Sequence, residues 1–286
     1  MLVDILSVSA RALGFVALFQ AAGIVVFLAL HEQQLPATRP LLRRLGIAAA
    51  LVAVVLLMAE FLLEPARMRG ELSGALDPAL RRILIHSATG VALSWQMLGL
   101  LLMIIALRVG RAAGTVAGVV GVVVLLAAFT FVGHTSSSGA RWVLSPVLLL
   151  HLWVVTFWFG ALLPLYLMSS RESAATSAHV VAQFSAQAIG LVPLLLLAGA
   201  TLAAGLLPGL AAFRTSYGEL LMVKLGGFCA LLLLAASNRW RWGPALRTGQ
   251  PQAGRRFRYA LTAEYLLIVG VLCVTAVMTS FYSPES

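Results

Sequence analysis

The chain has 286 residues, of which 61% are hydrophobic and only 10% are charged. Ordinary soluble domains carry about 25% charged residues, so this chain has too few polar side chains to cover a water-facing surface, and the composition predicts an all-α integral membrane protein. The net charge of +10 does not indicate nucleic-acid binding, because the arginines gather in short loops between apolar runs, where they set the orientation of a membrane protein.

Eight apolar runs follow one another along the chain, each long enough to cross about 30 Å of hydrocarbon as a helix of about 20 residues. We therefore expect a bundle of eight transmembrane helices, with residues 1–286 forming a single membrane domain and no room for a soluble one. The first run continues to Leu30 without a small-residue cleavage site, so we interpret it as a retained span. The expected spans cover residues 10–30, 45–63, 82–107, 113–132, 143–168, 183–207, 218–237 and 259–281.

The distribution of arginines predicts how this bundle is oriented. Twelve arginines fall in the connections after the first, third, fifth and seventh spans, and seven fall on the other side of the bundle. By the positive-inside rule, the side with twelve faces the cytoplasm. Both termini are then expected outside, which in a bacterium is the periplasm.

Three histidines approach the outer side of the bundle. We expect His86 about one turn into the third span, His134 just beyond the fourth, and His151 about two turns into the fifth, roughly 12 Å below its entry. An ionisable ring in hydrocarbon is costly and tends to face the bundle interior, so the three are candidate metal ligands. Either a bend at Gly133 brings His134 and His151 to one metal site, or the two rings belong to two successive metal sites. The alternative is that the histidines only form hydrogen bonds between helices.

Further candidate ligands fall in the same half of the bundle, where Glu60 lies near the outer end of the second span. On a helical wheel, His86 and Met97 share one stripe of the third span. Sulfur ligands suit Cu(I) and imidazole accepts copper, so the mixture indicates copper ion more than magnesium or calcium, although a methionine in a span is usually filler. Lys224 either reaches the headgroups or pairs with Glu219 or Glu60. The possible pathway residues are Met58, Met97, Met222, Met278, Cys229, Cys273, Glu219 and Lys224.

Other polar residues have simpler explanations. His31 and His179 flank spans on the inside and are expected to be solvated loop residues, and Glu264 is expected to pair with the cluster Arg255–Arg258. Gln20 and Gln183 are expected to form hydrogen bonds between helices. The chain has no phosphate-binding loop and no C-x-x-C motif, so we expect neither nucleotide binding nor enzyme activity, and transport must be driven by gradients or partners.

Four stretches in the second half occur in a characteristic order: a histidine-bearing aromatic span, a span opened by Phe-Ser, a span with lysine closed by Asn-Arg, and a last span with glutamate. They read "HLWVVTFWFGALLPL", "FSAQAIGLVPLLLLAGATLA", "YGELLMVKLGGFCALLLLAASNRW" and "RRFRYALTAEYLLIVGVLCVTAVMTSFYSP". Residues 151–286 thereby resemble the copper-resistance protein D (CopD) family of bacterial inner-membrane proteins. "GHT" at Gly133–Thr135 is similar to the Gly-His-Ala usual in that family, with Thr135 in place of alanine.

The resemblance implies an eight-span protein of the inner membrane that binds copper, works with a periplasmic copper carrier of the CopC type, and moves copper from the periplasm toward the cytoplasm. It implies metal ligands at His134 and His151, whereas His86 and Glu60 are added from their expected positions. One rival hypothesis is a redox protein with a b-type haem, for which His86 and His151 are the best available pair. Another is a structural or assembly protein of the membrane that transports nothing.

Overall fold

The structure, a computed structural model, describes residues 1–110, 112–207, 209–247 and 252–282, and all the regular structure in these ranges is helical. Eight helices are long and apolar enough to cross a membrane, which confirms the expected number of spans. They are α1 (Leu2–His31), α2 (Arg39–Arg69), α4 (Ala88–Val109), α5 (Ala112–Ala127), α7 (Arg141–Arg171), α8 (Ala174–Leu206), α9 (Ser216–Ser237) and α11 (Ala253–Phe281).

Short helices connect the spans. Three are α-helical, namely α3 (Pro78–Ile85), α6 (His134–Ser137) and α10 (Gly243–Arg247). Four are 3₁₀ turns: η1 (Glu32–Gln34), η2 (Leu72–Leu76), η3 (Ala128–Thr130) and η4 (Leu210–Arg214). A π-helical turn, η5 (Asn238–Trp242), continues α9 into α10.

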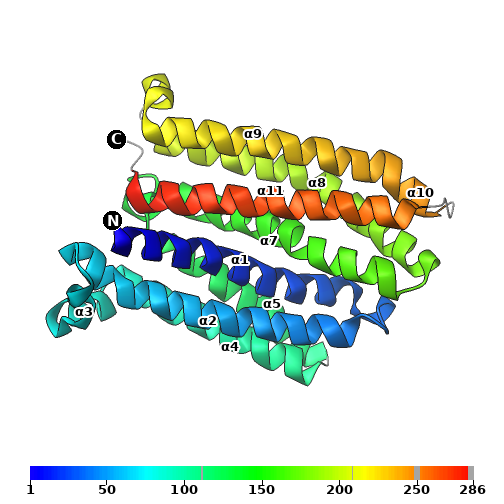
Figure 1. The fold of residues 1–286 in the computed structure, drawn as a ribbon, viewed down its shortest axis with the longest axis horizontal. Coiled ribbons are helices and arrows are strands. Elements are labelled where there is room, and N and C mark those ends of the chain that lie inside the picture. The colour runs from blue at the N-terminus through cyan, green and yellow to red at the C-terminus, as the bar shows by residue number, and fades with distance from the viewer. Residues whose placement is uncertain (111, 208, 248–251, 283–286) are drawn as a thin grey trace.

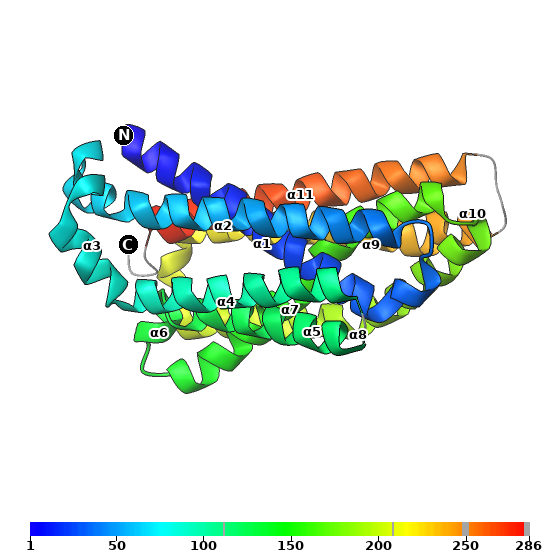
Figure 2. The same cartoon turned by 90° about the horizontal axis from the view of Figure 1, so that it is seen from below.

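The eight spans lie in two rows. Helices α9, α11, α1 and α2 follow one another in one row, and α8, α7, α5 and α4 follow one another in the other (Figure 1; Figure 2). Between the rows, α11 and α1 pack on α7, α1 also packs on α5, and α2 packs on α4. Few backbone contacts within the described ranges join α8 to α9, so the two rows are least closely joined at that edge.

The first span begins and the last span ends at the same end of the bundle, as expected. Figure 1 shows α1 beginning and α11 ending at the end of the bundle that also carries α3, and we call this the termini end. Arg11 ties it together, because its guanidinium donates to the Thr279 backbone oxygen at 3.1 Å and to Ser280 Oγ at 3.0 Å. The other end, which carries η1 and α10, is called the opposite end.

Helix α1 is the centre of the bundle. Every residue from Ala17 to Leu28 is buried, which is the pattern of a helix that is apolar on all sides. Its closest neighbour is α7: a Cβ built on Gly23 would lie 2.1 Å from Gly160 Cα. Gln20 Nε2 donates to the Gly160 backbone oxygen at 3.4 Å, which confirms the expected hydrogen bond between helices. Small residues thus let α1 and α7 meet at their backbones.

The expected limits of the third span are wrong. Residues 82–107 belong to two helices, because the chain breaks at His86 and Ser87 and α4 begins only at Ala88. Both helices have N-caps: Asp77 Oδ1 accepts from the backbone nitrogen of Ala79 at 2.9 Å, and Ser87 Oγ accepts from that of Thr89 at 3.2 Å. Capping oxygens of this kind satisfy backbone donors that the first turn leaves free, so a continuous apolar run is divided by local polar chemistry.

Candidate metal centre

His151 lies inside the bundle on α7, ten residues after Arg141 and therefore about 15 Å along the helix. Its ring faces α8, where a Cβ on Gly199 would lie 3.8 Å from His151 Cε1 and 3.9 Å from Nδ1. The Nδ1 atom is buried and has no hydrogen-bond partner in the described part of the chain. A buried polar atom without a partner is uncommon and calls for an explanation, such as a bound water or ion.

Lys224 on α9 is half-buried and lies near enough to His151 to interact with it electrostatically. The six ion pairs among the described residues do not include it. Of the two alternatives left open for Lys224, the pairing with Glu219 or Glu60 is therefore absent, and Glu219 is exposed at the start of α9. Helices α7, α8 and α9 thus bring an imidazole and an amine together at the loosely joined edge of the two rows.

Glu60 has a partner of its own. Its Oε1 atom accepts from Arg11 Nε at 2.6 Å, and both side chains are about one-fifth exposed. Since Arg11 also contacts Thr279 and Ser280, this ion pair joins α1, α2 and α11 at the termini end. The Glu60 carboxylate, which was expected to be a metal ligand, instead forms an ion pair with the Arg11 guanidinium.

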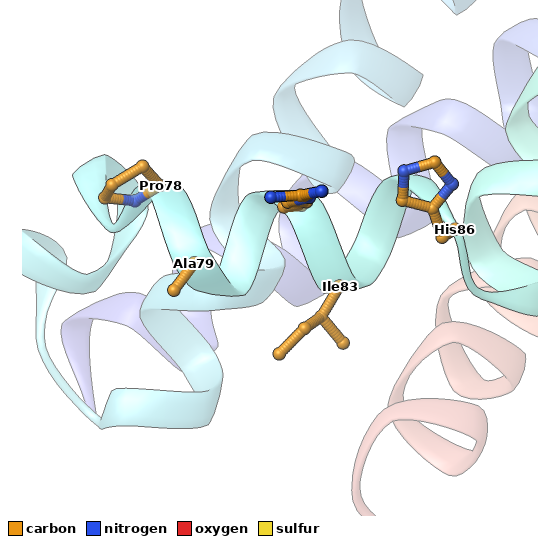
Figure 3. Close-up of a pocket in the computed structure, with 5 residues that line it drawn as sticks. Pro78, Ala79, Ile83 and His86 are labelled. Carbon is orange, nitrogen blue, oxygen red and sulfur yellow. The ribbon is translucent and has the colours of Figure 1, made fainter.

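His86 is exposed in the break between α3 and α4, so the expectation that it lies a turn inside the third span is wrong. It lines a shallow surface pocket with residues of α3 alone, among them Pro78, Ala79 and Ile83 (Figure 3). The remaining lining residue is Arg82, whose positive charge disfavours a metal cation. The stripe shared with Met97 does not exist, because His86 and Met97 belong to different segments. The b-type haem hypothesis required His86 and His151 at the same depth in the bundle, and the exposed position of His86 removes that pair.

The chain bends at Gly133, whose φ of 83° lies in the left-handed region that glycine adopts readily. His134 begins the one-turn helix α6 directly after this bend, and α6 packs against α7. The bend is therefore present, at the termini end of the bundle (Figure 2). The side chain of His134 lies outside the part of the structure that is described, so its position as a ligand stays a prediction.

Most of the possible pathway residues face outward. Cys229 and Cys273 are exposed, Met58 is 40% exposed and Met222 is 52% exposed. Met97 is half-buried on α4, and Met278 is buried near the end of α11. Among the described residues, no three histidine, cysteine, aspartate or glutamate side chains gather into a metal site. The structure thus leaves His151, a half-buried residue whose Nδ1 atom is buried, as the candidate in the termini half.

Two buried polar residues were misjudged from the sequence. His31 is not a solvated loop residue but the last residue of α1, only 2% exposed, while His179 is exposed on α8. Glu264 does not pair with the arginine cluster. It is 2% exposed, and its two carboxylate oxygens accept from Asn238 Nδ2 and, at 3.4 Å, from Trp158 Nε1.

Signals for these two misjudged residues were present but weak. The first apolar run continues to within one residue of His31, which favours helix over loop there. Glu264 lies 11 residues after the start of α11, or about 16 Å along it, well beyond the arginines. Its partners come from other helices, and that arrangement depends on the packing of the bundle.

Comparison with known families decides what kind of bundle this is. The family described as "Copper resistance protein D-like, N-terminal domain" matches residues 1–144, and the family described as "Copper resistance protein D" matches residues 178–278. The chain belongs to the copper resistance protein D family. It is accordingly a multi-pass protein of the bacterial inner membrane, and the name of its family denotes copper resistance and not a catalysed reaction.

A curated relative of this copper resistance protein D family member is the copper transport protein CutJ of Bacillus subtilis (strain 168). The two are 31% identical over 171 residues, which are 56% of this chain and 29% of CutJ. The chain thus covers less than a third of the length of that relative. No solved structure matches the chain.

Proposed function

We propose that this protein binds copper ion inside the bundle at His151 and moves it from the periplasm toward the cytoplasm. The observation that carries the proposal is the buried, unpartnered Nδ1 of His151 in a member of a copper resistance family. Neutral imidazole is a good copper ligand. His134, placed after the bend at Gly133, is proposed as the ligand at the mouth.

The direction rests on the arginines. The connections that hold twelve of them lead from α1, α4, α7 and α9, and the seven others belong to the termini end. The positive-inside rule then places the termini end in the periplasm. Copper would enter there from a periplasmic carrier of the CopC type, as the resemblance implies.

Copper binding by the purified full-length chain tests the ligand. We expect His151→Ala to lose one bound copper ion per chain, because alanine offers no donor in place of the ring. His86→Ala is the matched control, since His86 is exposed outside the spans, and it should bind as the wild type does. Equal copper content in His151→Ala and the wild type would contradict the assignment.

A substitution that fills the space beside the His151 ring, and leaves the ring in place, gives an independent test. A leucine at Gly199 would extend toward His151 from a Cβ position already 3.8 Å from the ring, so Gly199→Leu should weaken copper binding. A Cβ at Gly190 on the same helix would meet nothing within 4 Å, and Gly190→Leu should leave binding unchanged. Equal effects of the two substitutions would show that the face of α8 opposite His151 is not part of the site.

A further inference from the structure

The connection between α9 and α11 carries an unbalanced positive charge at the opposite end of the bundle. Residues 238–258 read "NRWRWGPALRTGQPQAGRRFR" and contain six arginines and no aspartate or glutamate. Five of these arginines have described side chains, of which three are exposed and two are half-buried. We call these five the arginine patch: Arg239, Arg241, Arg255, Arg256 and Arg258.

The fold brings arginines from both sides of this connection onto one aromatic ring. The guanidinium carbon of Arg241, in η5, lies 4.8 Å from the centroid of the Trp242 ring, and that of Arg256, on α11, lies 5.4 Å from the same ring. Helix α11 contacts both η5 and α10 at this end of the bundle (Figure 1). A cation–π contact stabilises each guanidinium, but two like charges on one ring repel each other, and a bound anion would remove that repulsion.

The turn that presents these arginines is held from inside the bundle. Asn238, the first residue of η5, is buried, and its Nδ2 atom donates to the buried carboxylate of Glu264 on α11. Trp158 Nε1, on α7, donates to the other oxygen of Glu264. π-Helical turns of this kind often occur at functional sites, and here the turn places Arg239 and Arg241 directly after an anchored residue.

No carboxylate of the described chain neutralises the arginine patch, because none of the six ion pairs among the described residues includes a member of it. Three glutamates lie in this half of the bundle, and each has another partner. Glu264 accepts from Asn238 and Trp158, Glu172 accepts from the Thr38 backbone nitrogen, and Glu32 forms an ion pair with Arg43. The counter-charge therefore has to come from outside the described chain.

Aromatic side chains place the arginine patch at the level of lipid headgroups. Trp240, in η5, is 75% exposed, and Tyr259, on α11, is 67% exposed, and tryptophan and tyrosine are enriched where a span leaves the hydrocarbon. Leu266 follows Tyr259 by seven residues, lies on the same face of α11 and is also exposed, as a side chain in contact with acyl chains would be. The anions found at this level of a membrane are the phosphates of phospholipids.

We propose that the arginine patch is a binding site for an anionic phospholipid, whose phosphate lies against Arg241 and Arg256 beside Trp242. Guanidinium groups bind phosphate through paired hydrogen bonds, and basic sites at the ends of transmembrane helices bind anionic headgroups. This lipid site is independent of copper and would exist whichever ion the bundle binds.

The positive-inside rule explains why arginines are frequent in this connection, but it requires only their number. Arginines that serve topology alone can lie apart in water, whereas here two from different elements share one ring. The two explanations therefore differ in one respect: only a lipid site depends on which arginines are present and on Trp242.

The test offers the purified full-length chain, in detergent, an equimolar mixture of phosphatidylglycerol and phosphatidylcholine with the same acyl chains, and native mass spectrometry counts the bound lipids. We expect the wild type to retain phosphatidylglycerol in preference. Because each arginine near an anionic surface strengthens binding by about fivefold, Arg241→Gln combined with Arg256→Gln should weaken phosphatidylglycerol binding by at least about tenfold. Arg82→Gln combined with Arg214→Gln is the matched control, since it removes two exposed charges from the termini end, and it should bind as the wild type does.

Trp242→Leu keeps every arginine and should still weaken phosphatidylglycerol binding, because it removes the ring that holds the two guanidiniums together. Its control is Trp142→Leu, at the exposed start of α7, which should have no effect.

Melting temperature in detergent separates a lipid from a free anion, because a ligand of the folded state raises it. Phosphatidylglycerol should raise the melting temperature of the wild type, whereas inorganic phosphate and sodium chloride at equal ionic strength should not. Three results would overturn the lipid site: equal retention of the two lipids, equal loss in the Arg241/Arg256 and Arg82/Arg214 double variants, or a rise with inorganic phosphate as large as that with phosphatidylglycerol.

Discussion

Buried polar side chains of this bundle differ in how many of their polar atoms have a hydrogen-bond partner. Glu264 is buried with both carboxylate oxygens accepting hydrogen bonds from Asn238 and Trp158, so its environment is complete within the protein. His31 and His151 instead retain ring nitrogens without partners in the described structure. A buried imidazole nitrogen that the fold leaves free is available to a metal ion, which is why His151 and not Glu264 carries the proposed copper site.

The charge on Lys224 acts directly on the copper site proposed at His151. A cationic amine near the ring repels a metal cation, and inside a bundle this repulsion is weakly screened. Lys224→Met should therefore tighten copper binding at His151 several-fold, measured by competition with a Cu(I) chelator. Arg214→Met, which removes an exposed cation from η4 before the same span, is the control and should change affinity little. Weaker binding in Lys224→Met would mean that the amine supports the site.

The sequence predicted helices better than their ends. Hydropathy indicated all eight spans, because crossing hydrocarbon requires a long apolar helix. It could not place His86, since the break before α4 depends on the cap formed by Ser87. It also missed the burial of His31 and the partners of Glu264, which come from contacts between residues as far apart as Trp158 and Glu264. The sequence thus predicts which residues form a span, but it does not predict which residues of other helices lie next to them.

Helix α7, which carries His151, crosses α1 with the two backbones in close contact at Gly23 and Gly160. A Cβ at Gly23 would lie 2.1 Å from Gly160 Cα and 2.7 Å from the Thr156 backbone oxygen, so Gly23→Ala forces the two helices apart. Overpacking of this kind costs about 1–3 kcal/mol, and we expect a lower melting temperature in detergent.

Gly270→Ala on α11 is the matched control for that crossing, because a Cβ there would meet nothing within 4 Å. It should melt as the wild type does or slightly higher, since alanine favours helix more than glycine does. Equal melting temperatures for Gly23→Ala and Gly270→Ala would mean that the backbone contact between α1 and α7 is not tight.

In the whole molecule, the candidate copper site lies nearer one end of the bundle than the other. His151 lies in the termini half, at the edge where α8 and α9 are loosely joined. In the orientation that we propose, the termini end faces the periplasm and the opposite end faces the cytoplasm. Under the proposed function, copper would therefore reach His151 from the periplasmic face of the bundle.

Copper uptake by the purified full-length chain in sealed proteoliposomes of known orientation measures both whether the protein transports copper and in which direction. The account predicts that wild-type protein carries copper inward from the face that bears the termini end, and that His151→Ala abolishes this uptake while His86→Ala does not. Uptake no greater than in protein-free vesicles, or equal uptake by His151→Ala and the wild type, would contradict it.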